Sequence, residues 1–313
     1  MKKIAIIGAG QLGSRHLQGL KTSNNELAIY VMDMSNDSLR LAEERYNQVS
    51  DNGYCKEVYF VTSIDSLPQD LDVAIIATGS IPRAMLTKAL LDHSNVKYLV
   101  LEKILFPRLA EYEEIQEVIK NKNVKAWVNC PRRLFAYYQK LHNMIDTPFE
   151  MTVDGSNWGL CCNSIHLLDI FLYLANESEY SVTHDVTSLE ESKRKGYIEM
   201  MGSFYFTTPK GCKLNLHCSK DEKIYGGWIK SDKYDIVIDK KNMKLIVNGA
   251  EEPILSYPNS QLTGKVVDQL LLNGNCGLTR FEDSCKYHKP IIEAILKEYN
   301  KLTGNKGDLC PIT

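Results

Sequence analysis

Up to about residue 125, short apolar runs alternate with segments in which apolar residues recur at helical spacing. The runs are rich in β-branched residues and almost continuously apolar, which is typical of parallel strands buried on both faces. Expected strands lie at 3–8, 27–33, 57–62, 72–78, 97–103 and 124–130, and expected helices at 11–22, 37–48, 81–92 and 110–121. Strands that alternate with helices predict a doubly wound parallel sheet.

Beyond residue 130 strands and helices are segregated instead of alternating. From about 185 to 256 several strands follow one another with turn signals between them, which predicts a mainly antiparallel, open sheet with helices on one face. The other expected elements are a strand at 148–154 and helices at 134–145, 163–175, 263–273 and 280–302. Pro290 should kink or divide the last helix. The sequence therefore predicts an α/β protein with two domains, residues 1–130 and 131–313.

The overall composition favours a small solute as the ligand. A formal net charge of −2 supplies no basic field to hold nucleic acid or a membrane surface. No stretch reaches the roughly 18 unbroken apolar residues of a membrane span, and glycines interrupt the apolar start too early for a signal peptide. The nine cysteines show no zinc spacing, so we expect free thiols, no metal site and a cytoplasmic location. Exposed strands in the second domain favour a homo-oligomer, either a dimer or a tetramer.

Three glycines directly follow the first expected strand and open the first expected helix. Gly8, Gly10 and Gly13 have the G-x-G-x-x-G spacing. In that spacing the first glycine makes the tight turn, the second lets a pyrophosphate approach, and the third lets the helix pack on the strand. The helix begins with Gln11 and Leu12, at an end whose free N–H groups attract phosphates. The sequence therefore predicts a dinucleotide site, the alternative being a glycine-rich turn that binds nothing.

The second expected strand ends in an acidic residue that bears on the choice of dinucleotide. Asp33 lies 20 residues after Gly13, where a carboxylate can accept hydrogen bonds from the adenosine ribose hydroxyls and would repel a 2′-phosphate. This favours NAD over NADP. Because Ser35 and Asn36 follow and could tolerate a phosphate, NADP remains possible.

Polar residues end three further strands of the expected parallel sheet. They are Thr78, the pair Glu102 and Lys103, and a segment that begins at Asn129. Ligands of doubly wound sheets lie outside the carboxyl ends of the strands, so we expect Thr78, Glu102 and Lys103 to contact the cofactor. Lys103 could also stabilise negative charge on a substrate oxygen, with Glu102 orienting it. The alternative is an exposed ion pair of little energetic value.

Five short motifs, in this order and spacing, resemble those of a known family, the Gfo/Idh/MocA oxidoreductases. They are GAGQLGSRH (8–16), AT (77–78), EK (102–103), NCPRR (129–133) and HLLD (166–169). The resemblance implies an N-terminal Rossmann domain and a C-terminal α/β domain whose open sheet often forms a dimer interface. It also implies hydride transfer between a nicotinamide and a hydroxyl-bearing carbon of a sugar, cyclitol or nucleotide-linked sugar.

The resemblance assigns roles to two residues and exposes two departures. In the family the lysine contacts the reacting hydroxyl, which carries over to Lys103, and a histidine acts as acid/base, which carries over to His166. Ile104 replaces the proline that follows the lysine, and Cys162 replaces an aspartate that often precedes the histidine. His166 alone would be read as a core histidine, and its correspondence with Lys103 reverses that preference. We expect His16 to pack beneath the cofactor loop.

The remaining candidate residues concern the substrate. The predicted substrate contacts are Asn129, Arg132, Arg133, Trp158, Asn163 and Asp169. The two arginines could grip a carboxylate or phosphate, although one solvated and one interdomain arginine is an equal alternative. Trp158 could line the pocket or the core, and Asn163 or Asp169 could take over part of the missing aspartate's role. The sequence predicts an NAD(P)-dependent oxidoreductase; the alternative is a non-catalytic NAD-binding regulatory or assembly protein that kept the fold.

Overall fold

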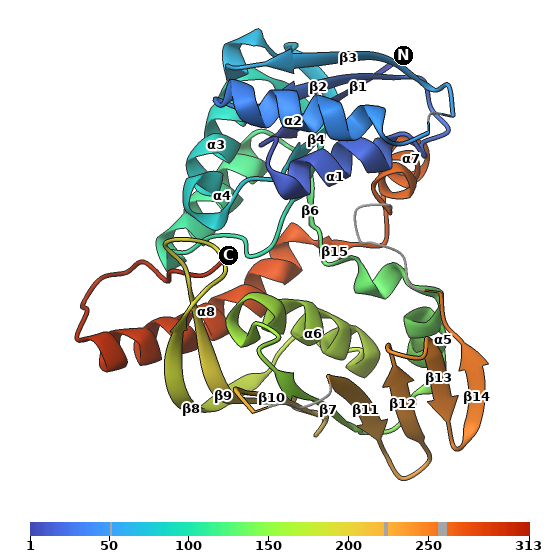
Figure 1. Cartoon of the computed structure of the whole chain (residues 1–313), viewed down its shortest axis with the longest axis vertical. Coiled ribbons are helices and arrows are strands. Elements are labelled where there is room, and N and C mark those ends of the chain that lie inside the picture. The colour runs from blue at the N-terminus through green and yellow to red at the C-terminus, as the bar shows by residue number, and fades with distance from the viewer. Residues whose placement is uncertain (51, 222–224, 256–261) are drawn as a thin grey trace. The chain divides into compact units, whose positions relative to one another are not determined.

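The computed structural model describes residues 1–50, 52–221, 225–255 and 262–313 of the chain. They group into two compact units (Figure 1). The first unit contains Met1–Phe106, Ala110–Pro131, helix α7 (Thr263–Asn273) and strand β15 (Thr279–Arg280). The second contains Pro107–Leu109, the described residues from Arg132 to Leu255, and Asp283–Thr313.

The first unit is built on a seven-stranded sheet with the order β15-β6-β5-β4-β1-β2-β3. All neighbouring strands are parallel except β15, which pairs antiparallel with β6. The parallel strands are β1 (Lys2–Ile7), β2 (Leu27–Met32), β3 (Cys55–Val61), β4 (Asp70–Ile76), β5 (Asn95–Leu101) and β6 (Lys125–Val128). This confirms the predicted doubly wound parallel sheet, whose inner strands are largely buried because most of their side chains are apolar, whereas the edge strand β3 is partly exposed.

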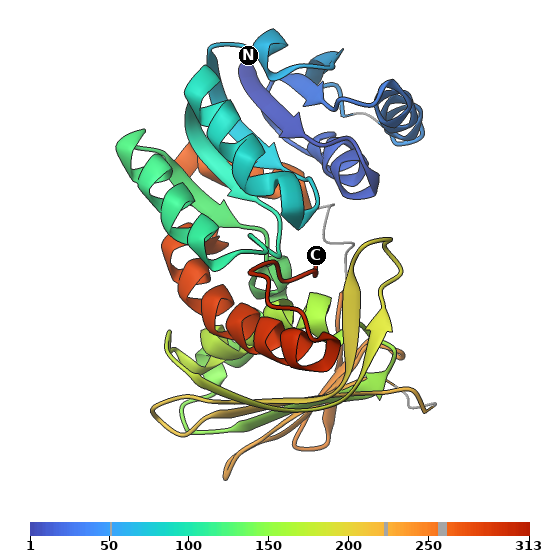
Figure 2. The same ribbon diagram turned by 90° about the vertical axis from the view of Figure 1, so that its left-hand side faces the viewer.

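Helices cover both faces of the parallel sheet. They are α1 (Gln11–Leu20), α2 (Asn36–Asn47), α3 (Ser80–His93) and α4 (Leu109–Asn121), with a short 3-10 turn η1 (Ile64–Ser66). Figure 2 shows α1 and α2 on one side of the sheet and α3 and α4 on the other. Helix α7 packs against α1, although more than 240 residues separate them in the sequence. The grouping of α7 and β15 with the first unit differs from the predicted second domain of residues 131–313.

The second unit is built on an eight-stranded sheet with the order β14-β13-β12-β11-β7-β10-β9-β8. Only β7 and β10 pair in parallel, which confirms the mainly antiparallel sheet that the sequence predicts. The strands are β7 (Glu150–Ser156), β8 (Ser181–Glu191), β9 (Ile198–Thr207), β10 (Lys213–Ser219), β11 (Gly226–Lys230), β12 (Asp235–Asp239), β13 (Lys244–Val247) and β14 (Ala250–Pro253).

Helices lie over one face of this sheet. They are α5 (Ala136–Met144), α6 (Leu160–Ala175) and α8 (Phe281–Thr303), preceded by the 3-10 turn η2 (Pro131–Leu134). In Figure 2, α6 and α8 lie on the same side of the sheet. Helix α8 continues through Pro290, so the helix is not divided there, and the alternative that Pro290 kinks it stays a prediction. Burial of Ile291, Ile292 and Ile295 outweighs the hydrogen bond that proline removes.

Over the part of the chain that the structure describes, no helix is long and apolar enough to cross a membrane.

Candidate functional site

The glycine loop joins β1 to α1, and its three glycines have different surroundings. Gly8 has φ +100°, and an added Cβ would lie 2.9 Å from Cγ2 of Thr78. A Cβ on Gly13 would lie 1.8 Å from the carbonyl oxygen of Gly8. A Cβ on Gly10 would meet no atom within 4 Å. The first and third glycines are therefore required by the protein's own packing, whereas the second leaves open space at the start of α1.

The open space lies at a helix end that suits an anion. Gly10 is the N-cap of α1 and has no side chain to accept hydrogen bonds from the first-turn N–H groups of Gln11 and Leu12. The Oγ of Ser14 donates to the carbonyl oxygens of Ala9 (3.1 Å) and Gly10 (2.8 Å), which holds the loop on the helix. Such a helix end favours phosphate oxygens.

Asp33 directly follows β2 and is tied to the same loop. Its Oδ2 accepts from the backbone N–H of Ala9 (2.8 Å), and its Oδ1 accepts from that of Ser35 (2.9 Å). These two bonds fix the orientation of a half-buried carboxylate that can accept further hydrogen bonds. Its predicted contact with the ribose stays a prediction.

Thr78, after β4, adds a polar group beside the loop. Its Oγ1 is buried and has no hydrogen-bond partner among the described residues. Together with the space at Gly10 and the uncapped end of α1, this hydroxyl leaves polar groups that a bound dinucleotide could satisfy. The residues of the loop therefore fit such a cofactor.

Glu102 directly follows β5 and is the centre of a buried hydrogen-bond network. It is 3 % exposed, and its Oε1 accepts from Nε2 of His16 (2.8 Å) and from Nδ2 of Asn129 (2.5 Å). Burial would raise the pKa of Glu102, but these bonds and the nearby charge of Arg83 outweigh it and lower the pKa below its usual range. Nδ1 of His16 is hydrogen-bonded to Oγ1 of Thr263, on α7 (2.8 Å).

This network bears on three predicted roles. His16 is buried and binds Glu102 directly, and its predicted packing beneath the cofactor loop stays a prediction. The hydrogen bonds of Glu102 to His16 and Asn129 fix the ends of β5 and β6, and the predicted contacts of Glu102 and Asn129 with cofactor and substrate stay predictions. Sequence reasoning missed Thr263, because nothing in the local pattern links it to a residue 247 positions earlier.

Lys103 is half-buried directly after the network, and the segment that follows it is fixed by an arginine. Arg83, buried in α3, donates to the carbonyl oxygens of Leu105 (2.9 Å), Ile104 and Thr78. The peptide bond between Lys103 and Ile104 is cis. Ile104 stands where the resemblance expects proline, and Arg83 links the segment to the end of β4. Sequence reasoning missed Arg83, which reads as an ordinary helix residue.

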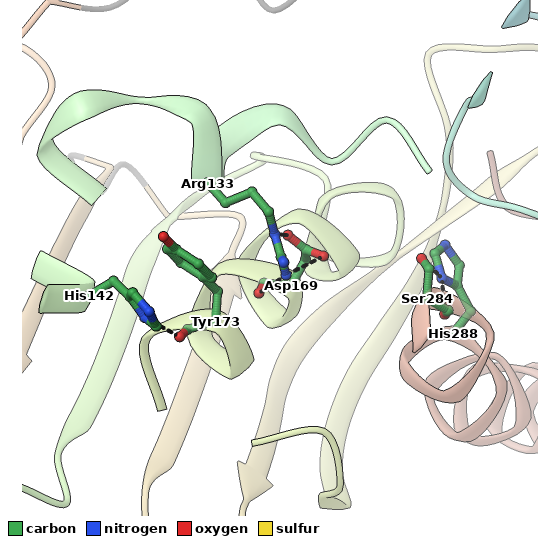
Figure 3. A network of polar contacts seen from close by, with 6 residues as sticks. All are labelled: Arg133, His142, Asp169, Tyr173, Ser284 and His288. Carbon is green, nitrogen blue, oxygen red and sulfur yellow. Dashed lines mark hydrogen bonds and ion pairs between the residues drawn. The ribbon is translucent and has the colours of Figure 1, made fainter. Parts of the chain in front are cut away.

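In the second unit, α6 presents His166 and Asp169 one turn apart. His166 is 8 % exposed and Asp169 is 1 % exposed. Asp169 forms a bidentate pair with Arg133, at 3.0 Å from Nε and 3.1 Å from Nη2 (Figure 3). The Arg133 guanidinium also lies over the ring of Tyr173, 4.9 Å from its centre, and His142 stacks on that ring. Arg133 and Asp169, both predicted substrate contacts, therefore bind each other.

A carboxylate from another element, which the sequence did not reveal, contacts the start of α6. Glu199, on β9, accepts from the backbone N–H groups of Cys161 (2.7 Å) and Cys162 (3.3 Å). It thus lies beside position 162, where the resemblance expects an aspartate. Nδ2 of Asn163 donates to the carbonyl oxygen of Trp158 (2.6 Å), which closes the turn before the helix. Sequence reasoning missed Glu199 because it belongs to a strand far along the chain.

The candidate residues form two groups, one described in each unit. In the first unit the carboxyl edge of the parallel sheet brings together Gly8, Gly10, Gln11, Leu12, Gly13, Asp33, Thr78, Glu102, Lys103 and Asn129. In the second unit the residues on or beside η2 and α6 are Arg132, Arg133, Trp158, Asn163, His166 and Asp169. No cluster of three or more His, Cys, Asp or Glu side chains suited to a metal occurs in the described ranges.

A doubly wound sheet with a glycine loop before its first helix defines a dinucleotide-binding fold. Residues 2–130 match the model of the Gfo/Idh/MocA family, described as "Oxidoreductase family, NAD-binding Rossmann fold". Over these residues the chain is similar to that oxidoreductase family, and its N-terminal part is an NAD-binding Rossmann fold.

Solved structures resemble the chain over nearly its whole length. An oxidoreductase from Agrobacterium radiobacter, in complex with NAD⁺, L-tartaric acid and magnesium, is 17% identical, with 97% of each chain covered and a TM-score of 0.73. A candidate myo-inositol dehydrogenase from Sinorhizobium meliloti 1021 is 14% identical, with 95% of this chain and 98% of that chain covered and a TM-score of 0.68. UDP-N-acetylglucosamine 3-dehydrogenase from Acidithiobacillus ferrooxidans is 13% identical, with 94% and 95% covered and a TM-score of 0.68.

At these identities the likeness shows the fold. The comparison with curated protein sequences gives no match.

Proposed function

We propose that the protein is an NAD(P)-dependent oxidoreductase that transfers hydride between a nicotinamide and a carbinol carbon of a sugar, cyclitol or nucleotide-linked sugar. One observation carries the proposal. The neighbouring strands β5, β4 and β1 are followed within two residues by Lys103, Thr78 and Gly8, so the lysine lies at the same sheet edge as the glycine loop. The carboxylate of Asp33, tied to that loop, favours NAD over NADP.

The proposed roles follow from the chemistry of each side chain. A bound nicotinamide dinucleotide supplies the hydride acceptor or donor. The amine of Lys103 hydrogen-bonds the substrate oxygen and stabilises the negative charge that develops there. His166 takes the hydroxyl proton during oxidation and returns it during reduction. Arg83 is a positioning residue, because its hydrogen bonds to the carbonyl oxygens of Ile104 and Leu105 fix the segment that carries Lys103.

Proteins of similar fold support the substrate class. Their names include dehydrogenases of a cyclitol and of a nucleotide-linked sugar, both of which carry several carbinol carbons. The proposal also includes a cytoplasmic location and a homo-oligomer that associates through the open face of the eight-stranded sheet. Its support is the balanced net charge and the long exposed strands of that sheet.

The test separates cofactor binding from turnover. We expect a Lys103→Met variant to bind NADH like the wild type in a fluorescence titration, while turnover falls by about a hundredfold or more. Lys97→Met is the matched control, because Lys97 lies on the same strand but is exposed towards its other end. Turnover is sought by screening NAD⁺ reduction over UDP-, GDP- and CDP-sugars, free hexoses and inositols.

Two outcomes would contradict the proposal. Equal turnover of Lys103→Met and Lys97→Met would remove the role of the amine. Tight NADH binding with no turnover across the whole panel would favour a non-catalytic NAD-binding regulator.

A further inference from the structure

Two basic residues of the second unit lie near each other, with no carboxylate partner among the described residues. Arg132 belongs to η2, and Lys240 follows β12. Neither forms an ion pair with any described residue, unlike the neighbouring Arg133. Buried positive charge is normally paired, because removing it from water is costly. The buried guanidinium nitrogen of Arg132, with a second cation beside it, therefore needs an explanation.

Arg132 lies in a group of tyrosines. Tyr225, Tyr138 and Tyr137 are its close neighbours, and its Nη1 is buried with no hydrogen-bond partner among the described residues. Burial would lower the pKa of Arg132, but the neighbouring tyrosines more than offset this, so the guanidinium stays charged. A guanidinium has five N–H donors and no acceptor, so the orphan nitrogen calls for an acceptor.

Lys240 approaches the same tyrosine from a neighbouring strand. In the antiparallel pair β11–β12, Gly227 lies opposite Ile238. Two residues further along each strand, the same register places Tyr225 opposite Lys240, on the same face of the sheet. The Nζ of Lys240 lies 5.4 Å from the centre of the Tyr225 ring. Although the side chain as a whole is exposed, burial of its amine and the charge of Arg132 lower the pKa of Lys240 to about 7.

The acidic groups nearest in the sheet are directed elsewhere. Asp239 accepts from the backbone N–H of Asn242 (2.9 Å) and from its Nδ2 (2.7 Å). Asp154, on β7, lines a hollow on the sheet together with His217 and Ser203. Residues that alternate along a strand face opposite sides, so Asp154 faces away from the core side on which its neighbour Gly155 meets Tyr225.

Aromatic rings give the cluster a fixed wall. Trp158 and Tyr225 meet edge to face, with ring centres 6.0 Å apart. A Cβ on Gly155 would lie 3.0 Å from Cα of Tyr225 and 3.3 Å from Cδ1 of Trp158, so a glycine is needed beneath both rings. The indole N–H of Trp158 donates to the carbonyl oxygen of His217 (2.7 Å), which holds the ring in place.

We infer that Arg132 and Lys240, walled by Tyr225 and Trp158, form a binding site for an anionic oxygen group of the substrate, a carboxylate or a phosphate. The guanidinium supplies the N–H donors of its unpartnered Nη1, and the amine supplies a point charge with rotatable donors. Buried tyrosine hydroxyls add neutral donors, because burial raises the pKa of Tyr137 and of Tyr138. The assignment of the anion to the substrate rests on the proposed function, whereas anion binding itself does not.

The experiment measures anion binding by the full chain without cofactor. Inorganic phosphate and malonate are titrated into the wild type by calorimetry, so that the preferred anion distinguishes a phosphoryl from a carboxylate ligand. We expect one site, and about tenfold weaker binding in Lys240→Met and in Arg132→Met. Lys241→Met is the matched control, because Lys241 is the exposed neighbour of Lys240 and should bind as the wild type does. Circular dichroism checks that each variant is folded.

The outcomes are distinct from those of the proposed function. No saturable binding of either anion, or equal binding by Lys240→Met and Lys241→Met, overturns the anion site whatever the enzyme does. Lys240 is an exposed residue, so this variant decides the matter on its own. When a substrate is found, Lys240→Met should raise the KM for its anionic form, with kcat nearly unchanged. A raised KM for a neutral substrate would contradict a role for the site in charge recognition.

Discussion

Arg132 and Arg133 are consecutive residues of one 3-10 turn, yet their surroundings differ. Arg133 is fully engaged by the carboxylate of Asp169 and the face of Tyr173. Arg132 lies among tyrosines, with a buried nitrogen that no described residue satisfies. The difference shows that residue type does not decide whether a buried cation is structural. What decides is whether the protein supplies the opposite charge.

The same contrast separates two glycines of the first unit. The place of a Cβ on Gly13 is filled by the backbone of Gly8, whereas the place of a Cβ on Gly10 is empty. A position closed by the protein should affect stability when it is changed. A position left open should affect the binding of whatever fills it.

The largest effect on stability is expected at Arg133, whose charge is paired with Asp169. Asp169→Asn removes the charge that compensates Arg133 in a buried pair, so the free energy of unfolding should fall by about 3–5 kcal/mol. Arg132→Met should change it by less than about 1 kcal/mol, because no ion pair with a described residue is lost. Urea denaturation followed by circular dichroism measures both. Equal losses in the two variants would show that the two arginines do not differ in this way.

The next effect concerns the closed network of the first unit. Glu102→Gln should lower the free energy of unfolding by about 1.5–3 kcal/mol near neutral pH, because its charge strengthens the bonds from His16 and Asn129. The folded-state pKa of Glu102 is lowered, so the unfolded state takes up the proton first as the pH falls. Its contribution is therefore present above the unfolded pKa and is lost as the pH falls through the folded pKa.

Denaturation curves from acid to neutral pH test this sign. The curves of Glu102→Gln and wild type should converge at the acid end. Glu114→Gln is the control, because its exposed pair with Lys88 should contribute little at any pH. A constant difference between Glu102→Gln and wild type would exclude a charged Glu102 in the network.

The sequence predicts the features that depend on residues close together in the chain. Apolar runs alternate with helical segments over the first half of the chain, and this local signal is enough to predict the parallel sheet. The G-x-G-x-x-G spacing likewise locates the loop, because its geometry depends on residues that are close in sequence. Pro290 shows the limit of a local signal, since helix α8 continues through it where packing is sufficient.

Residues that complete the sites come from distant parts of the chain. Thr263 reaches His16 from α7, and Glu199 reaches the start of α6 from β9. Each contact depends on tertiary packing that leaves no periodic pattern around the residue. For the same reason Arg132 and Arg133 look equivalent in the sequence and are separated only by the structure.

A smaller effect is expected from the glycine pair. Gly13→Ala places a methyl group against the Gly8 carbonyl, and the resulting shift should cost about 1–3 kcal/mol of stability and weaken NADH binding as well. Gly10→Ala meets no protein atom, so its stability should stay within about 0.5 kcal/mol of wild type while NADH binding weakens. Thermal unfolding and NADH fluorescence titration measure the two properties. Wild-type NADH affinity in Gly10→Ala would show that no phosphate approaches this glycine.

The smallest effect is a pH dependence that sharpens the contrast at Arg132. Because the pKa of Lys240 is lowered to about 7, its charge is lost as the pH rises through that value, whereas Arg132 stays charged and the buried tyrosines stay neutral. Sulfate keeps its own charge over this range, so its affinity should fall severalfold from about pH 6 to about pH 8 in the wild type. The affinity of Lys240→Met should be weaker and independent of pH.

The same titration has a counterpart in stability, with the opposite trend. Without an anion, the folded state releases the Lys240 proton near pH 7, while the unfolded state keeps it until its ordinary pKa of 10.5. The unfolded state therefore binds more protons between these values, and the free energy of unfolding should rise with pH there. Bound sulfate should reduce this rise, because an anion keeps Lys240 protonated. The free energy of unfolding is measured against pH for wild type and Lys240→Met, with and without sulfate. The same pH dependence in both proteins would show that Lys240 does not contact the anion.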